Sequence, residues 1–208
     1  MPVNILEKLF GSAARIKIIR LFLLNQDTIF TPKEISRRCK VAPNLVRREI
    51  SLLKSIGFAE QKSETIEKLI KLKNGKIKNN KKKIQGLKLD ESFPLLRALK
   101  SLVLNAAPIS RKKMEKTLKS AGKIKLIILS GIFIQADGSR VDLLLVGDGI
   151  KSGILERALR NIEAEIGKEL TYSVFDTKEF LYRLGIYDRF VYDILDYPHE
   201  KILNKLDI

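Results

Sequence analysis

Positive charge is concentrated in the first half of the chain. Residues 1–100 carry 23 basic and 9 acidic side chains, whereas residues 101–208 carry 17 and 15. This asymmetry argues for two domains with different partners, and 208 residues are enough for both to have apolar cores. We therefore expect domains at 1–90 and 91–208, with nucleic acid or an anionic membrane surface as the partner of the first. A basic surface without a partner is the alternative.

The composition excludes several classes of protein. Cys39 is the only cysteine and His199 the only histidine, which excludes a disulfide framework and a multi-cysteine zinc cluster. No apolar run approaches the ~20 residues of a membrane helix, and the first residues lack the order of a signal peptide. We expect a cytoplasmic protein without a membrane, metal or cofactor. Cys39 is interpreted as a small buried residue and His199 as a local structural residue.

Three short helices are predicted in the first domain. Residues 12–25 have apolar side chains at helical spacing, and Thr31-Pro32 begins a second helix with a capping hydroxyl and a proline in its first turn. Pro43 begins a third helix, 43–56. Because about three residues join the second and third helices, the pattern indicates a helix-turn-helix.

The third predicted helix has one apolar stripe and an opposite polar face. Val46, Ile50 and Leu53 form the stripe. The side chains opposite are donors that base edges and phosphates accept, so we expect them to read double-stranded DNA: Asn44, Arg47, Arg48 and Ser51. Basic side chains before this helix are expected to bind phosphates: Lys33, Arg37, Arg38 and Lys40.

Residues 58–90 mix apolar positions with many lysines. Ten lysines and two glutamates lie between Lys62 and Lys88. Asn74-Gly75 is typical of a hairpin turn, and the Asn79–Lys83 stretch is typical of an exposed tip. We expect an extended β-hairpin whose ammonium groups contact phosphates along the minor groove: Lys76, Lys78, Lys81, Lys82 and Lys83. A disordered basic linker is the alternative.

The segment KEISRRCKVAPNLVRREISLLKSIGF, residues 33–58, resembles the winged helix-turn-helix of ArsR/MarR-type transcriptional regulators. The resemblance extends from Ser12 to Asp90. It implies that helix 43–56 lies in the major groove and that the β-hairpin is the wing. Ala42 departs from the pattern, because such proteins often have a capping serine there. Metal-sensing relatives use clustered cysteines, which this chain lacks.

The second half predicts an α+β domain with a small mixed sheet. Apolar runs flanked by turn residues indicate the strands, and longer periodic segments indicate the helices. The expected helices are 93–105, 110–121, 151–166, 177–195 and 199–206. The expected strands are 124–134, 141–146 and 170–175.

The segment LSGIFIQADGSRVDLLLVGD, residues 129–148, resembles the minimal nucleotidyltransferase fold. In that family, paired carboxylates hold Mg²⁺ against nucleotide phosphates. Gly131 and the second carboxylate, Asp142, match, whereas Ile132 and Arg140 replace a small residue and the first carboxylate. At ~4 Å and an effective dielectric near 20, a unit cation repels a divalent ion by roughly 8 kcal/mol. We therefore expect Arg140 to pair with Asp142 and the domain to transfer no nucleotide.

These features predict a DNA-binding transcriptional regulator whose second domain is a vestigial nucleotidyltransferase. That domain is expected to form a homodimer through residues 93–105 and 177–195, or to bind a small anionic ligand through Arg140, Lys123 and Lys125. A folded spacer is a further alternative. Two other functions stay open. One is an active nucleotidyltransferase of the toxin–antitoxin type that modifies a protein or small molecule, and the other is RNA binding.

Overall fold

Two separate units of helices and small sheets make up the chain. The computed structural model describes residues 5–71, 77–105, 109–136 and 138–208, and gives only the backbone of the strand residues between 66 and 82. One unit comprises Met1–Pro108 with Ala164–Lys168, and the other comprises Ile109–Glu163 with Glu169–Ile208. The class is mixed α+β, as expected. In the described parts of the chain, no helix is long and apolar enough to cross a membrane.

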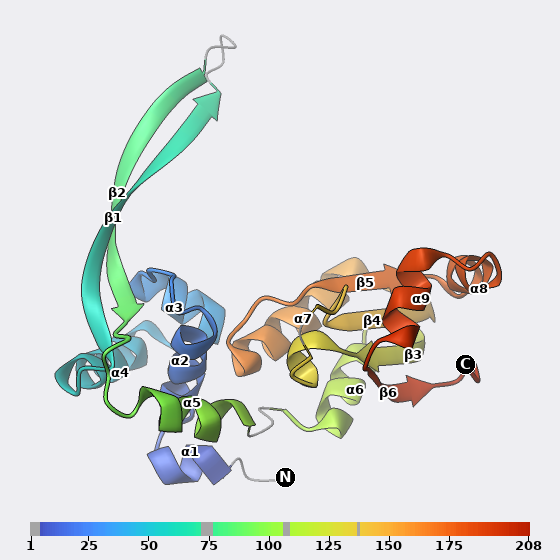
Figure 1. Cartoon of the computed structure of the whole chain (residues 1–208), viewed down its shortest axis with the longest axis horizontal. Coiled ribbons are helices and arrows are strands. Elements are labelled where there is room, and N and C mark those ends of the chain that lie inside the picture. The colour runs from blue at the N-terminus through green and yellow to red at the C-terminus, as the bar shows by residue number, and fades with distance from the viewer. Residues whose placement is uncertain (1–4, 72–76, 106–108, 137) are drawn as a thin grey trace. The chain divides into compact units, whose positions relative to one another are not determined.

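Among the described residues of the first unit, four helices precede the hairpin (Figure 1). They are α1 (Ile5–Phe10), α2 (Ala13–Leu24), α3 (Pro32–Cys39) and α4 (Pro43–Ser55). The Ser12 hydroxyl caps α2 by accepting from the Arg15 backbone N–H, and Thr31 and Glu34 form a reciprocal capping box on α3. The three predicted helices are confirmed, while α1 was not expected.

A long antiparallel hairpin follows α4. Its strands are β1 (Ala59–Lys71) and β2 (Ile77–Leu89), paired from Ala59 opposite Leu89 to Lys71 opposite Ile77. At ~3.4 Å per residue each strand is about 40 Å long, and Figure 1 shows the hairpin extending away from the helices of its unit. The expected exposed tip at Asn79–Lys83 is wrong, because those residues belong to β2 and pair with β1. The Asn74-Gly75 turn lies outside the described residues.

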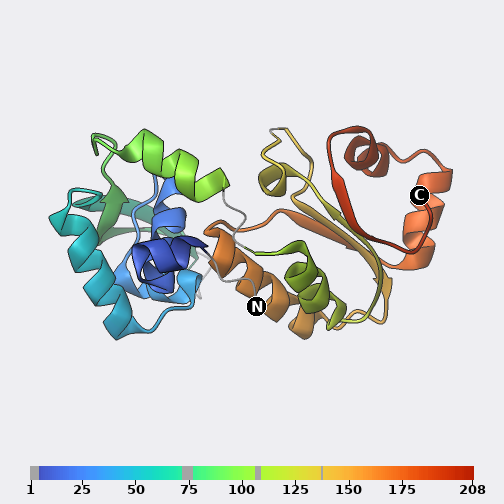
Figure 2. The same ribbon diagram turned by 90° about the horizontal axis from the view of Figure 1, so that it is seen from below.

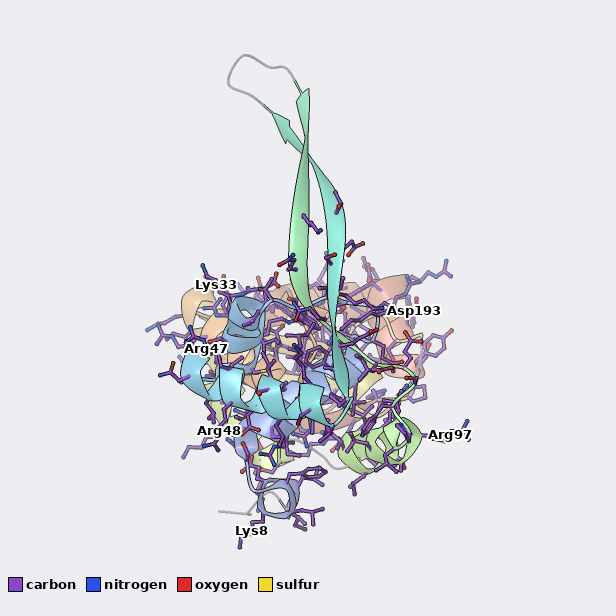
Figure 3. The ribbon with its side chains drawn as sticks, turned by 90° about the vertical axis from the view of Figure 1, so that its left-hand side faces the viewer. Lys8, Lys33, Arg47, Arg48, Arg97 and Asp193 are labelled. Atoms are coloured by element: carbon purple, nitrogen blue, oxygen red, sulfur yellow. The ribbon has the colours of Figure 1, made fainter. Side chains whose placement is uncertain are left out.

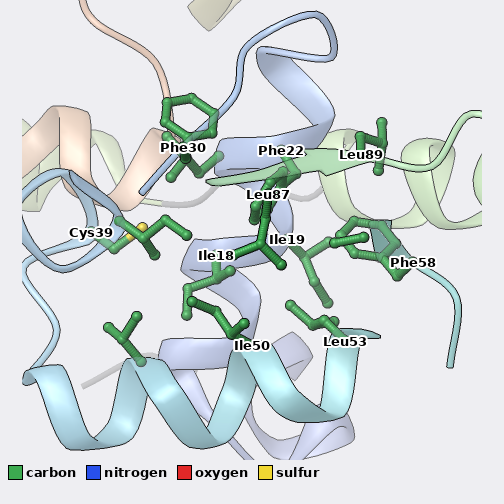
Figure 4. Close-up of a cluster of buried hydrophobic side chains, with 14 of the residues drawn as sticks. Ile18, Ile19, Phe22, Phe30, Cys39, Ile50, Leu53, Phe58, Leu87 and Leu89 are labelled. Carbon is green, nitrogen blue, oxygen red and sulfur yellow. The ribbon is translucent and has the colours of Figure 1, made fainter. Parts of the chain in front are cut away.

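The base of the hairpin is joined to the helical core through Phe30. The backbones of Phe30 and Leu87 exchange two N–H···O bonds of 2.9 Å. Gly86 lies so close to this bridge that an added Cβ would be 2.6 Å from the Phe30 carbonyl oxygen. Phe22 makes edge-on contacts with Phe30 and Phe58, at centroid distances of 5.6 and 6.2 Å. Figure 4 shows these rings within the apolar core above α4.

Helix α5 (Leu96–Asn105) belongs to the first unit. Val103 is buried in the core of that unit, and Leu96, Leu99 and Leu104 pack against it. The first unit therefore extends to Pro108 and differs from the expected 1–90, because the apolar side of α5 is covered by this core.

The second unit contains a four-stranded mixed sheet. Strands β3 (Lys123–Leu129), β4 (Leu143–Asp148), β5 (Tyr172–Phe175) and β6 (Glu200–Asn204) have the order β5-β4-β3-β6. Of the strand pairs described in this sheet, β4–β5 is parallel, and β3–β4 and β3–β6 are antiparallel.

Helices cover the sheet of the second unit. Figure 2 shows α6 (Arg111–Lys119) and α7 (Ser152–Ile166) together on one face. Helices α8 (Thr177–Gly185) and α9 (Arg189–Asp196) contribute Phe180, Val191 and Ile194 to a core with Leu126 and Leu144.

Two expected elements of the second unit are wrong. The predicted helix 199–206 is the strand β6, which pairs with β3 and so satisfies backbone groups that an open edge would leave unpaired. The predicted strand 124–134 ends at Leu129, because Gly131 adopts φ +52° and begins the 3₁₀ turn Gly131–Phe133.

We predict that Gly86→Ala destabilises the first unit by about 1–3 kcal/mol, because its methyl group would displace the Phe30 backbone. Denaturant unfolding monitored by circular dichroism measures the change. Gly153→Ala is the control, since a Cβ there meets nothing within 4 Å. Equal stability of the two variants would contradict the close approach of Gly86 to Phe30.

Candidate nucleic-acid interface

The solvent face of α4 is polar and basic. Val46, Ile50 and Leu53 are buried, as predicted, while the expected DNA-reading residues are exposed: Asn44, Arg47, Arg48 and Ser51. Figure 3 shows Arg47 on the same side of α4 as Lys33, with Arg48 on the opposite side. The N-terminus of α4 has no side-chain cap at Ala42, in agreement with the noted departure from the family pattern.

The acidic side chain of α4 faces the protein interior. Glu49 has a side chain only 1% exposed, and its carboxylate accepts hydrogen bonds from Ser12 Oγ and Arg15 Nε, both at 2.8 Å. Burial raises the pKa of Glu49, but the hydrogen bonds from Arg15 and Ser12 outweigh this effect and hold the pKa below its ordinary value. Consequently α4 presents cations and neutral donors to solvent.

The expected phosphate-binding residues before α4 differ in their exposure. Lys33 and Arg37 are exposed on α3, and Lys40 is exposed in the following turn with φ 52°. Arg38 is half-buried, and its guanidinium lies over the Phe30 ring at 5.4 Å from the centroid. This intramolecular contact with Phe30 therefore leaves the Arg38 guanidinium less available to a phosphate.

The expected wing lysines lie near or in β2. Lys83 is exposed, the backbones of Lys78, Lys81 and Lys82 belong to the strand, and Lys76 lies outside the described residues. At the hairpin base, Lys88 pairs with Asp27 and Glu91, each at 3.2 Å. The base of the hairpin is thus locally balanced in charge.

Gly131 and Asp142 lie together in the second unit, as their shared motif predicts. A Cβ on Gly131 would collide with Asp142 Oδ1. That oxygen accepts from the Ile132 backbone N–H at 3.0 Å, and Oδ2 accepts from the Thr171 N–H at 2.9 Å. The Asp142 carboxylate therefore closes a turn. Within the described residues, no group of three or more histidine, cysteine or acidic side chains is arranged to hold a metal ion.

The expected pairing of Arg140 with Asp142 is wrong. Arg140 binds Asp193 on α9, with Nε–Oδ2 at 2.8 Å and Nη2–Oδ2 at 2.6 Å. The Asp142 oxygens instead accept from two backbone N–H groups, those of Ile132 and Thr171.

The lysines expected beside Arg140 as an anion site are also arranged differently. The Lys125 ammonium binds Asp148 at 2.8 Å and, together with Thr177, lowers the pKa of Asp148 to about 2. Lys123 is exposed. Because Arg140 and Lys125 are both neutralised by carboxylates, this arrangement does not favour an anionic ligand.

Sequence reasoning missed Glu49 and Arg15. A usable signal was present for Glu49, since it lies three residues after Val46 and four before Leu53, on the buried side of the helix. Arg15 is 34 residues away in sequence, so only the folded chain identifies it as the partner of Glu49.

No family model, curated protein or solved structure matches the chain.

We predict that Glu49→Gln lowers the free energy of unfolding by about 2 kcal/mol at neutral pH, because Arg15 loses its buried counter-charge. Since the folded state lowers the pKa of Glu49, this stabilisation is complete above the ordinary value of 4.5 and disappears as pH falls through the folded value. Urea unfolding at several pH values should show the gap between wild type and variant closing under acid conditions.

Glu60→Gln is the matched control for this experiment, because the Glu60 carboxylate is 41% exposed and pairs with Lys62 at the surface. A gap for Glu49→Gln that stays constant into acid would contradict the assigned ion pair.

We predict that the Cys39 thiol of the folded protein does not react with an aromatic disulfide reagent at mildly alkaline pH. Cys39 is 1% exposed, and burial raises the pKa of its thiol to about 12. Unfolding in denaturant should release one reactive thiol per chain, measured by absorbance. Rapid modification without denaturant would instead support a thiol sensor.

Proposed function

We propose that the first unit binds double-stranded DNA as a winged helix-turn-helix and that the protein regulates transcription. The observation that carries this proposal is the division of charge on α4. Asn44, Arg47, Arg48 and Ser51 face solvent, while Glu49 is buried and paired with Arg15. A duplex approaching α4 thus meets donors and cations.

The dimensions and chemistry of α4 suit the major groove of DNA. A helix with its side chains is about 10–12 Å across, and the groove is about 12 Å wide. Arginine pairs with the O6 and N7 atoms of guanine, asparagine pairs with the N6 and N7 atoms of adenine, and serine binds several base edges. Asn44 and Arg48 are therefore proposed as the main base-reading residues. Ser51 follows them along α4 and is proposed to contact a further base edge.

The surrounding cations are proposed to bind phosphates. Lys33, Arg37 and Lys40 precede α4 and are exposed. The paired strands β1 and β2 support a wing and not an unstructured linker, and their lysines would extend the contact along the duplex.

We propose a non-catalytic role for the second unit. Asp142, which would hold Mg²⁺ in a nucleotidyltransferase, uses both carboxylate oxygens to bind backbone N–H groups. Homodimer formation stays a prediction, supported in this unit by exposed apolar side chains on the expected segment 177–195: Leu181, Tyr182, Ile186 and Tyr187.

Selection of bound fragments from a random DNA pool at two salt concentrations tests the proposal. Arg48→Ala should reduce discrimination between preferred and shuffled duplexes by about tenfold to a hundredfold. Replacing Lys81, Lys82 and Lys83 with alanine should weaken binding to all sequences alike and lower the salt slope by about 2–3. The wild type should lose ~10³-fold affinity or more between low and moderate salt if six phosphates are neutralised.

Three outcomes would contradict the proposal. They are no binding of duplex DNA at low salt, tighter binding of RNA with the same sequence, and equal loss of sequence preference in the two variants.

A further inference from the structure

Two shallow grooves lie beside α4. The first is lined by Pro32, Arg47, Ile50, Ser51 and Lys54. The second is lined by Arg15, Arg48, Glu49, Ser51, Leu52 and Ser55. Because Ser51 lines both grooves, the ridge between them is the solvent face of α4 itself, and Figure 3 shows Arg47 and Arg48 on its opposite sides. The grooves thus lie on the two sides of this ridge.

The charged side chains that line the first groove are basic. Arg47 and Lys54 are both exposed, and none of the described residues that line this groove is acidic. Lys54 lies in the last turn of α4, one turn beyond Ile50.

The second groove is also cationic, although it contains a carboxylate. The Glu49 side chain is 1% exposed, whereas those of Arg15 and Arg48 are 26% and 76% exposed. Arg15 donates from Nε to Glu49 and from Nη1 to the Phe10 carbonyl oxygen, each at 2.8 Å. These bonds hold the guanidinium in place, and among the described residues its Nη2 has no hydrogen-bond acceptor. The carboxylate therefore orients one arginine and contributes no accessible negative charge.

We propose that the two grooves receive the two phosphate backbones that border the major groove, with Arg15 and Lys54 as phosphate ligands. The inference rests on the proposed insertion of α4 into DNA. A helix that fills a groove about 12 Å wide has one DNA strand on each side. Each strand then meets a cationic groove, while the ridge with Asn44 and Ser51 faces the bases and Arg48 lies at the edge of that ridge, beside the second groove. Neither Arg15 nor Lys54 belongs to the set expected from the sequence.

Salt-dependent binding of single variants tests the assignment. Lys54→Gln and Arg15→Gln should each lower affinity about fivefold to tenfold near ~0.1 M salt and reduce the slope of log K against log salt by about 0.9. The losses should be the same for a preferred duplex and a shuffled duplex, because phosphates carry no sequence information. Arg97→Gln is the matched control, since it removes one exposed cation from α5 (Figure 3) and should leave the slope unchanged.

A second measurement alters the DNA and does not require an Arg15 variant, which is useful because Arg15 also neutralises Glu49 and its replacement affects folding. Single methylphosphonate linkages, which remove one phosphate charge at a time, are placed along both strands of the preferred duplex. Two groups of sensitive linkages are expected, one on each strand across the same major groove. Linkages sensitive with wild type should become insensitive with Lys54→Gln on one strand only.

The outcomes separate this proposal from the proposed function. Wild-type binding with sensitive linkages on a single strand, or a Lys54→Gln slope equal to that of Arg97→Gln, would overturn the assignment of the grooves and leave DNA binding intact. Failure of the wild type to bind any duplex would overturn both.

Discussion

The buried carboxylate of Glu49 determines how α4 is held and what it presents to solvent. Ser12 caps α2 and also donates to Glu49, while Arg15 in the first turn of α2 donates to the other carboxylate oxygen. The start of α2 and the middle of α4 therefore share one hydrogen-bonded cluster. The same contact removes the negative charge of α4 from its surface and orients a guanidinium beside it. The Glu49 cluster with Ser12 and Arg15 thus both holds α4 against α2 and leaves the solvent face of α4 positively charged.

The hairpin depends on a different constraint, the close approach of two backbones. Gly86 allows β2 to bond with Phe30, and the Phe30 ring packs against Phe22 in the core. Acidic residues neutralise Lys88 at this base, so the lysine excess of residues 62–88 belongs to the part of the hairpin beyond the base. The hairpin is attached to the core at its base and carries its excess lysines further along the strands. This arrangement suits contact with phosphates at a distance from α4.

In the second unit, groups that suggest enzyme chemistry have structural partners. Asp142 closes the turn that begins at Gly131, and the side chains of Arg140 and Lys125 bind Asp193 and Asp148. The Gly131–Asp142 spacing that resembles a nucleotidyltransferase is thus explained by turn closure. This unit offers apolar surface on α8, and its proposed role is in association.

Local patterns in the sequence by themselves determined helices α2, α3 and α4, the caps of α2 and α3, the buried stripe of α4 and the presence of a hairpin. Periodicity, capping hydroxyls and turn residues act over a few positions, so they can be recognised without knowing the rest of the fold. Tertiary structure alone decided that residues 200–204 form a strand, that α5 joins the first core, and that Arg140 and Arg15 find distant carboxylates. These outcomes depend on which strand edge, apolar surface or charge lies nearby after folding. The residues concerned are far apart in the sequence, so local sequence patterns do not predict that they meet.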